Sequence, residues 1–145
     1  MVYDSNEEKV PLKNEINYIK NFVDLKLLKD SRGMDVELYL DSSVENLMIA
    51  PLLLIPFVEN AFKHSKIENL NDGYIKINLI ADSQWMEFKV VNSIPENNFT
   101  KDEVGGVGLE NTKKRLELLY PNGKYKLKIN PTENRFEVVL KLKLF

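Results

Sequence analysis

The chain has 145 residues, a length that suits one domain and that buries roughly 70% of its unfolded surface on folding. Its 20 basic and 22 acidic side chains give a net charge of −2, so there is no basic surplus to recruit nucleic acid or an anionic membrane surface. One histidine and no cysteine exclude a disulfide framework and leave too few soft ligands for a zinc site.

The N-terminal part of the chain predicts a helix followed by a strand. Residues 1–10 are polar and lack periodicity, so we interpret them as an arm or as the truncated end of an upstream segment. From Pro11 to Leu28, apolar residues recur every three or four positions, which indicates an amphipathic helix that is capped near Gly33. Alternation of apolar and polar residues over 34–40 then predicts a half-buried strand.

An apolar run that begins at Leu47 predicts the central helix of the fold. Pro51 is acceptable in the first turn of this helix, whereas Pro56 is expected to remove a backbone hydrogen bond and to bend or restart the helix. The run is shorter than the ~20 apolar residues that cross a bilayer. We therefore expect a soluble chain that makes no direct membrane contact.

The C-terminal part predicts two hairpins separated by a loop and a helix. Alternating strands over 75–79 and 86–90 form the first hairpin, a helix runs from Leu109 to Tyr120, and a second hairpin follows over 125–144. Residues 93–107 between them hold no pattern, so we expect a long loop that is mobile without ligand and serves as a lid.

These elements predict the fold class of a domain that spans residues 11–145. The expected architecture is α+β, a two-layer sandwich in which a mixed sheet of about five strands is covered on one face by about three helices. No internal repeat is present in the sequence.

Residues 56–65, Pro-Phe-Val-Glu-Asn-Ala-Phe-Lys-His-Ser, place four polar side chains on two turns of an otherwise apolar helix. Asn60 shares a face with Lys63 and His64, and Glu59 lies one step round, where it can pair with Lys63 at i,i+4. Each residue also has an ordinary role, as a core amide, an ion pair or a structural imidazole. A single amide oxygen can nevertheless serve Mg²⁺, which takes most of its ligands from phosphates and water.

A glycine cluster, Gly105-Gly106-Val107-Gly108, opens the helix that begins at Leu109. Backbone N–H groups at a helix start favour an anion such as phosphate, and glycine leaves them unobstructed. The spacing fits neither the Rossmann nor the P-loop motif, so alone the cluster is equally a flexible hinge. Combined with the polar helix edge, it indicates a metal-binding amide and a phosphate-binding helix start on opposite sides of one cleft.

The two motifs in this order resemble a known family. Residues 56–65 resemble the N box of sensor histidine kinases of the LytS-like group, in which a proline precedes the box and Lys-His follows it. Residues 105–121, Gly-Gly-Val-Gly-Leu-Glu-Asn-Thr-Lys-Lys-Arg-Leu-Glu-Leu-Leu-Tyr-Pro, resemble the second glycine box of that group and its helix. Residues 11–32 resemble the helix that enters the domain, so the resemblance covers nearly the whole chain.

The resemblance implies the Bergerat ATP-binding fold, with ATP and Mg²⁺ as cofactors and protein-histidine kinase as the activity. Asn60 would bind the Mg²⁺ that bridges the phosphates, with Glu59 beside it as a further catalytic residue. Lys63 would neutralise phosphate charge, and the neighbouring His64 would complete the nucleotide-binding edge.

The same resemblance assigns the other side of the nucleotide site to the glycine box. Gly106 and Gly108 would admit the triphosphate to the helix start at Leu109, and Arg115 would contact phosphate. Phosphoryl transfer would then depend mainly on positioning and charge neutralisation.

One box of the family is absent. Relatives carry an Asp-x-Gly-x-Gly box after the second hairpin strand, and its aspartate accepts a hydrogen bond from the adenine amino group. Here that strand ends Val90-Val91-Asn92-Ser93-Ile94-Pro95. We predict that the side-chain carbonyl of Asn92 accepts the bond instead, although a neutral acceptor in place of a charged one costs on the order of 1 kcal/mol.

The family's phosphoacceptor histidine lies upstream in a helical dimerisation segment, and no residue before Pro11 matches it. We therefore expect the catalytic piece of a larger kinase, which would phosphorylate that segment and, through the parent protein, a response regulator. The resemblance implies a cytoplasmic domain of a parent anchored in the inner membrane.

Two alternatives stay open at this point. The first is a degenerate nucleotide-binding or pseudokinase module that acts through protein contacts, which the missing aspartate-glycine box favours. The second is a gyrase-like ATPase, which would need a base one turn before Asn60, where Pro56 stands.

Overall fold

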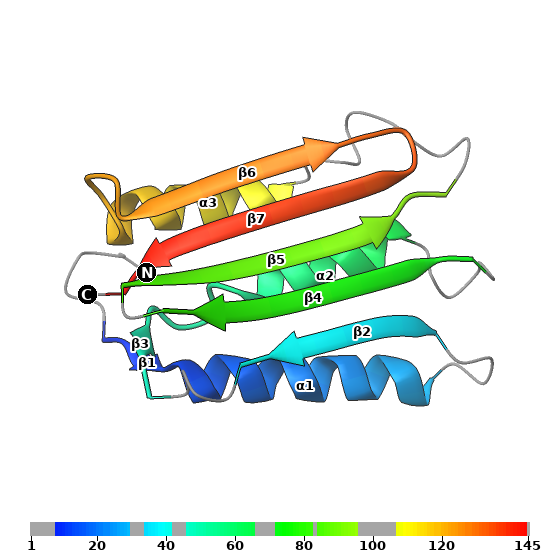
Figure 1. Ribbon diagram of the computed structural model, residues 1–145, viewed down its shortest axis with the longest axis horizontal. Coiled ribbons are helices and arrows are strands. Elements are labelled where there is room, and N and C mark those ends of the chain that lie inside the picture. Colours follow the sequence, from blue (N-terminus) through cyan, green and yellow to red (C-terminus); the bar gives the residue numbers. More distant parts are fainter. Residues whose placement is uncertain are drawn as a thin grey trace.

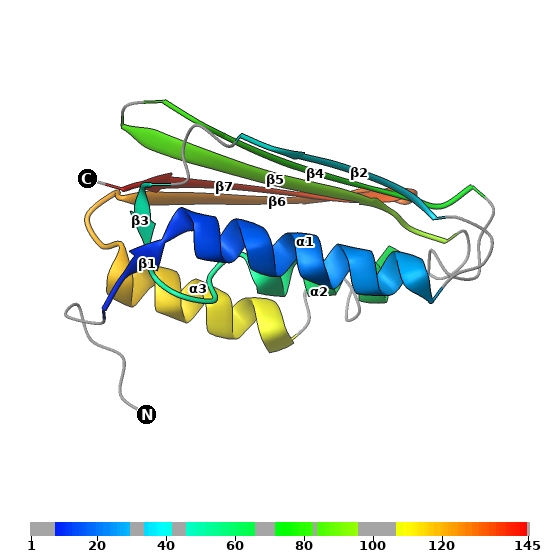
Figure 2. The same ribbon diagram turned by 90° about the horizontal axis from the view of Figure 1, so that it is seen from below.

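The computed structural model describes residues 8–29, 34–41, 46–65, 72–82, 84–95 and 107–144. Within these ranges, the chain forms three helices and seven strands, arranged as a helical layer against a five-stranded mixed sheet (Figures 1 and 2). The helices are α1 (Leu12–Leu28), α2 (Ile55–Ser65) and α3 (Val107–Leu119); the strands are β1 (Val10–Pro11), β2 (Asp35–Leu40), β3 (Met48–Ile49), β4 (Tyr74–Ala81), β5 (Trp85–Ser93), β6 (Tyr125–Pro131) and β7 (Arg135–Lys143). The predicted α+β sandwich is confirmed.

The large sheet has the strand order β2-β4-β5-β7-β6. Strands β4 and β5 form one antiparallel hairpin and β6 and β7 form another, and the two hairpins join where β5 pairs with β7. Only β2 pairs in parallel among these strands, and its connection to β4 passes through α2, because parallel neighbours need a crossover. The sheet is therefore mixed, as expected.

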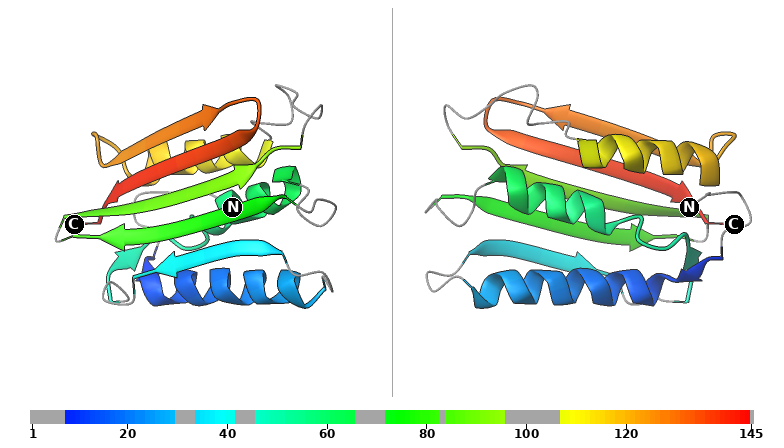
Figure 3. Two further views of the ribbon diagram at one scale, coloured as in Figure 1. Left: turned by 45° about the vertical axis from the view of Figure 1, so that its right-hand side comes forward. Right: turned by 180° about the vertical axis from the view of Figure 1, so that it is seen from behind.

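All three helices cover the same face of this sheet (Figure 2). Seen from behind, α2 lies between α1 and α3 (Figure 3, right), and it packs on β4 and β5. The strands alternate buried and exposed residues, as the period-two pattern predicted. The core between the layers includes Leu12, Ile16, Ile19, Phe57, Val58, Ile75, Ile77, Leu79, Phe88, Val90, Leu116, Val138 and Leu140.

The prediction for the central helix was wrong at its start. The helix begins at Ile55, whereas the apolar residues before it form β3 and a tight turn. Leu52, in that turn, has a φ of 57°, a left-handed conformation that a right-handed helix cannot include. Pro56 therefore lies in the first turn of α2, where its missing N–H has no helical partner to lose, so no bend results.

A small antiparallel sheet was also missed by the sequence patterns. Val10 pairs with Ile49 and Pro11 with Met48, so the start of the described chain is fixed to the segment before α2. Strands of two residues carry too little periodicity to be predicted.

Most other boundaries agree with the predictions to within two residues, but β5 continues to Ser93, three residues beyond its predicted end and into the first residue of the predicted lid. Helix α1 starts at Leu12 with Pro11 as its N-cap, and α3 starts at Val107 instead of Leu109. The predicted cap at Gly33 and residues 96–106 of the predicted lid lie outside the described residues.

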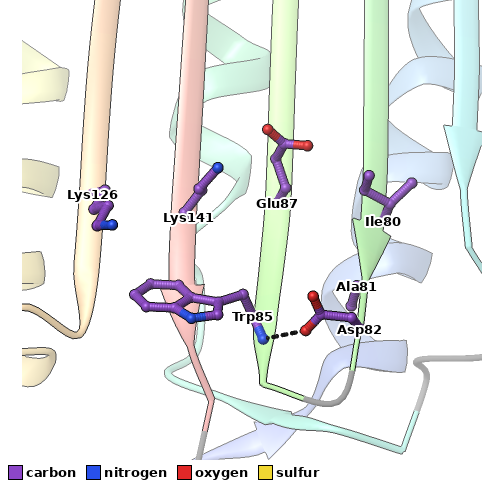
Figure 4. Close-up of a pocket in the computed structure, with 7 residues that line it drawn as sticks. All are labelled: Ile80, Ala81, Asp82, Trp85, Glu87, Lys126 and Lys141. Atoms are coloured by element: carbon purple, nitrogen blue, oxygen red, sulfur yellow. Dashed lines mark hydrogen bonds between the residues drawn. The ribbon is translucent and has the colours of Figure 1, made fainter.

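The turn of the β4–β5 hairpin is closed by a side chain. The Asp82 carboxylate accepts hydrogen bonds from the backbone N–H groups of Gln84 and Trp85, both at 2.8 Å, and Figure 4 shows the bond to Trp85. The bond from Trp85 and then that from Gln84 hold the pKa of this exposed carboxyl below its usual value of 3.8, because they stabilise the charged form.

We expect Asp82→Ala to lower the free energy of unfolding at neutral pH, with the deficit disappearing in acid. Because the folded-state pKa of Asp82 is lowered, its contribution is complete above about 3.8 and is lost as the pH falls through the lowered value. Urea unfolding of both proteins at several pH values measures this. Glu133→Ala, in the turn between β6 and β7, is the control, and an equal deficit at every pH would contradict the prediction.

Candidate functional site

Helix α2 is amphipathic, and its polar edge carries the predicted nucleotide-binding residues. Its buried side chains, Ile55, Phe57, Val58, Ala61 and Phe62, pack into the core. The four predicted residues lie around the remaining side of the helix: Glu59 and Lys63 are exposed, and Asn60 and His64 are half-buried. The structure therefore brings these four residues to one edge, with Asn60 at the border between core and solvent.

The predicted i,i+4 ion pair between Glu59 and Lys63 is not formed in the part of the chain that the structure describes. Both side chains are exposed, and water solvates two such charges about as well as they solvate each other. Lys63 and Glu59 are thus both available to a ligand.

The last residues of β5 form a second part of the site. Asn92 lies opposite Ile75 on β4 and Phe136 on β7, which are core residues, so its side chain is on the helix-covered face of the sheet. Only 1% of Asn92 is exposed. Asn92 ends a strand that packs against α2. A buried asparagine is unusual there, because burying an amide costs free energy unless it is fully hydrogen-bonded.

The hydrogen bonding of Asn92 is incomplete. Its Nδ2 donates to the Ser93 carbonyl at 2.9 Å, whereas its Oδ1 is buried and accepts no hydrogen bond from the described residues. The Ser93 carbonyl fixes the amide orientation, because reversing the amide would place two oxygen atoms against each other. A buried acceptor without a partner costs about 1–3 kcal/mol, so this oxygen marks a position where a donor is missing.

Ser93 itself holds the end of β5 to the start of β4. Its Oγ accepts from the Tyr74 N–H at 2.9 Å and donates to the Tyr74 carbonyl at 3.3 Å. Asn92 is therefore fixed by the sheet and not by the helices.

The start of α3 provides the third part of the site. Helix α3 packs beside α2, and Leu109 in its first turn is buried. Gly108 belongs to this first turn, whereas Gly106 lies outside the described residues. The N-terminal end of α3, a thirteen-residue helix, carries the positive end of the helix dipole, and α3 packs beside α2.

Arg115 does not extend toward the glycine end of α3 in the structure. Its guanidinium donates to the carbonyls of Pro51 and Leu52, at 2.9 and 3.3 Å, in the turn before α2. The predicted phosphate contact of Arg115 stays a prediction, and the described contacts give this residue a structural role.

Glu15 holds the same turn and was missed by the sequence interpretation. Its carboxylate accepts from the N–H groups of Leu52, Leu53 and Leu54, at 3.0, 3.1 and 3.5 Å, and only 5% of the residue is exposed. The signal was present in the sequence, because Glu15 lies on the apolar stripe of α1. A carboxylate at a buried position needs a specific hydrogen-bonding partner.

The turn is held from a third side by Tyr120, at the end of α3. Its buried hydroxyl accepts from the Ala50 N–H at 3.0 Å. Residues 50–54, hereafter the α2 turn, are therefore fixed by side chains from both neighbouring helices.

A depression on the opposite face of the sheet is separate from this site. Trp85, Glu87, Lys126 and Lys141 are among its lining residues (Figure 4), and Lys126 lies 5.3 Å from the centre of the Trp85 ring. These side chains are on the face that no helix covers, and none of them is buried.

Comparison with known proteins shows which proteins this chain resembles. The sequence matches no family model. It is 25% identical over 118 residues to Sensor protein LytS of Bacillus subtilis. The alignment covers 74% of this chain but only 20% of LytS. The chain thus spans about a fifth of the length of this curated relative.

Solved structures share the fold. The nucleotide-free catalytic domain of histidine kinase ThkA matches with a TM-score of 0.66 at 20% identity, over 94% of this chain and 96% of that domain. The chain has the fold of a histidine kinase catalytic domain. Histidine kinase AdeS of Acinetobacter baumannii matches with a TM-score of 0.66 at 18% identity, over 98% of this chain and 69% of AdeS. A complex of ThkA with response regulator protein TrrA matches with a TM-score of 0.65 at 19% identity, over 95% of this chain and 42% of that kinase.

The resemblance to LytS-like kinases that the two motifs predicted is confirmed by these matches. In this chain, α2 packs on β5 and beside α3, so the three parts of the candidate site belong to neighbouring elements. The individual site residues stay predictions.

Tyr120→Phe tests the importance of the α2 turn for stability. The variant leaves the buried Ala50 N–H without its acceptor, so we expect the free energy of unfolding to fall by about 1–3 kcal/mol. Thermal unfolding measures the change. Tyr39→Phe, at an exposed position on β2, is the matched control and should stay within about 0.5 kcal/mol of the wild type. Equal stability of the two variants would contradict the prediction.

Proposed function

We propose that this chain is the ATP-binding catalytic part of a two-component sensor histidine kinase. The observation that carries the proposal is the buried Oδ1 of Asn92, which lacks a donor among the described residues. It lies at the end of β5, where the resemblance would put the acceptor of the adenine amino group. The kinase fold and the two motifs support a nucleotide as the ligand that would donate to this oxygen.

Asn92 suits adenine better than guanine. The Ser93 carbonyl orients the amide so that Oδ1 is the atom left without a partner in the described part of the chain, and adenine would present an amino group to it. Guanine presents a carbonyl at the corresponding position, and two acceptors would repel each other. The site is therefore complementary to ATP even though the usual aspartate is replaced by a neutral amide.

The polar edge of α2 suits the phosphates and their metal. Within the described residues, no group of three or more His, Cys, Asp or Glu side chains could hold a metal ion alone. Asn60, half-buried and on the edge of α2, would provide one oxygen ligand, and phosphates and water would provide the rest. Bound Mg²⁺ supplies positive charge that favours phosphoryl transfer.

The remaining site residues have roles that follow from their charge and place. Lys63 would neutralise the phosphates, and Glu59 and His64 would assist at the same edge. Gly106, Gly108 and the backbone at Leu109 would receive the triphosphate at the positive end of α3. In the reaction, a histidine nitrogen forms a bond to the γ-phosphorus while the bond from that phosphorus to the bridging oxygen breaks, which releases ADP.

The acceptor histidine and the response regulator would be supplied by the rest of the parent protein and its partner. ThkA is seen in complex with its response regulator, which supports a partner of this kind. No helix among the described residues is long and apolar enough to cross a membrane. We infer a cytoplasmic position for this domain, with membrane anchoring elsewhere in the parent.

Binding of Mg²⁺ and ADP tests the proposal through thermal unfolding. A ligand at 100 times its dissociation constant stabilises by about 2.7 kcal/mol, which raises the midpoint by several degrees in a domain of this size. We expect a Mg²⁺-dependent rise in the wild type that is lost in Asn60→Ala and kept in Asn78→Ala, a matched change on β4. No rise at millimolar nucleotide with folded protein would favour the degenerate interaction module.

Asn92→Leu separates a functional role from a structural one, because the two predict opposite results. Among the described residues, the variant removes a buried acceptor that lacks a partner and also the Nδ2 donor to the Ser93 carbonyl. These two effects oppose each other, so we expect its free energy of unfolding to change little, while adenosine and ADP binding is lost. Calorimetric titration and urea unfolding measure the two quantities. Asn78→Leu is the control. Lower stability with unchanged adenosine binding would assign Asn92 a structural role only.

A further inference from the structure

We propose that Glu15 is a positioning residue for the metal-binding edge of α2, and that it acts through the α2 turn. The inference rests on the proposed nucleotide site and adds a residue that belongs to none of its motifs. Glu15 is on α1, and its three hydrogen bonds to Leu52, Leu53 and Leu54 fix where α2 begins.

The geometry makes this turn the support of the site. Leu54 is followed directly by α2, and Asn60 lies five residues beyond the helix start, roughly 7.5 Å along the axis. A helix is rigid over such a length, so a displacement of the turn moves Asn60 and Lys63 together. Asn92 does not move with them, because Ser93 fixes it to β4.

Burying a carboxylate costs free energy, so its use to hold a turn indicates that the position of the turn matters. Glu15 is taken out of water among apolar side chains, and it has to be paired with backbone donors to remain there. The opposite side of the same turn is held by the Arg115 guanidinium, which donates to Pro51 and Leu52. The N–H groups of the α2 turn are thus bonded to a negative charge from α1, and its carbonyls to a positive charge from α3. Together these contacts fix the position of the turn.

Direct electrostatics and positioning predict opposite effects of neutralising Glu15. A negative charge near bound phosphates repels them, so its removal would tighten nucleotide binding if charge alone mattered. Positioning predicts weaker binding, because glutamine offers only one acceptor oxygen and presents an amide N–H₂ to the other backbone donors. The sign of the change therefore identifies the mechanism.

Isothermal titration of the full chain with ADP and Mg²⁺, with ADP alone and with adenosine tests the proposal. For Glu15→Gln we expect affinity for ADP with Mg²⁺ to fall about tenfold or more, as for supports of metal ligands generally. Affinity for adenosine should be unchanged, because the proposed adenine contact depends on β5, which Ser93 holds to β4. Glu117→Gln, at an exposed position on α3, is the matched control and should bind like the wild type.

Glu15→Asp keeps the charge but retracts the carboxylate by one methylene, and it replaces Glu15→Gln if that variant does not fold. It should show the same selective loss of Mg²⁺-dependent affinity. Unchanged or tighter binding of ADP with Mg²⁺, or an equal loss for adenosine, would overturn the inference. A wild type that binds adenosine but shows no Mg²⁺ dependence, or binds no nucleotide, would instead refute the proposed function on which the inference rests.

Discussion

The structure depends on the five residues of the α2 turn, where the chain leaves the small sheet and enters its central helix. Backbone groups in such a turn have no regular partners, so they need side chains to satisfy them away from water. Here Glu15 accepts from three N–H groups, Arg115 donates to two carbonyls and Tyr120 accepts from Ala50. The helical layer is therefore joined by polar contacts at this point and by apolar packing elsewhere, which gives α2 one axial position among helices that could otherwise slide.

Much of the fold could be predicted from periodicity, because the patterns of α1, α3 and the hairpin strands are long and regular. The start of α2 could not, since Leu47 to Leu54 is as apolar as the helix that follows, and composition does not distinguish a buried turn from a buried helix. The start of α2 is set by the left-handed conformation of Leu52 and by the contacts that Glu15 and Arg115 make with it. Glu15 is 37 positions and Arg115 is 63 positions from Leu52 in the sequence. Tertiary contacts of this separation leave no local signal.

The candidate site divides in the same way. The polar residues of α2 and the glycines before α3 were found because motif spacing is a local property. Asn92 was predicted because the family carries its adenine-binding aspartate after this strand. The structure adds what the sequence does not contain: the burial of Asn92 and an acceptor that has no partner among the described residues. The contacts of Arg115 with the Pro51 and Leu52 carbonyls could not be predicted from its motif. A motif shows which residue type recurs at a position, but not which atoms it contacts.

The two halves of the proposed site are anchored on different layers. Asn92 is held by strand pairing and by Ser93, so the base position belongs to the sheet. Asn60 and Lys63 belong to a helix whose start is fixed by α1 and α3, so the phosphate position belongs to the helical layer. Apolar contacts between layers are non-directional and allow small shifts, whereas each anchor is directional. The distance between base and phosphate positions is therefore set by the packing of helices on sheet, and an interaction that moves α1 changes it through Glu15.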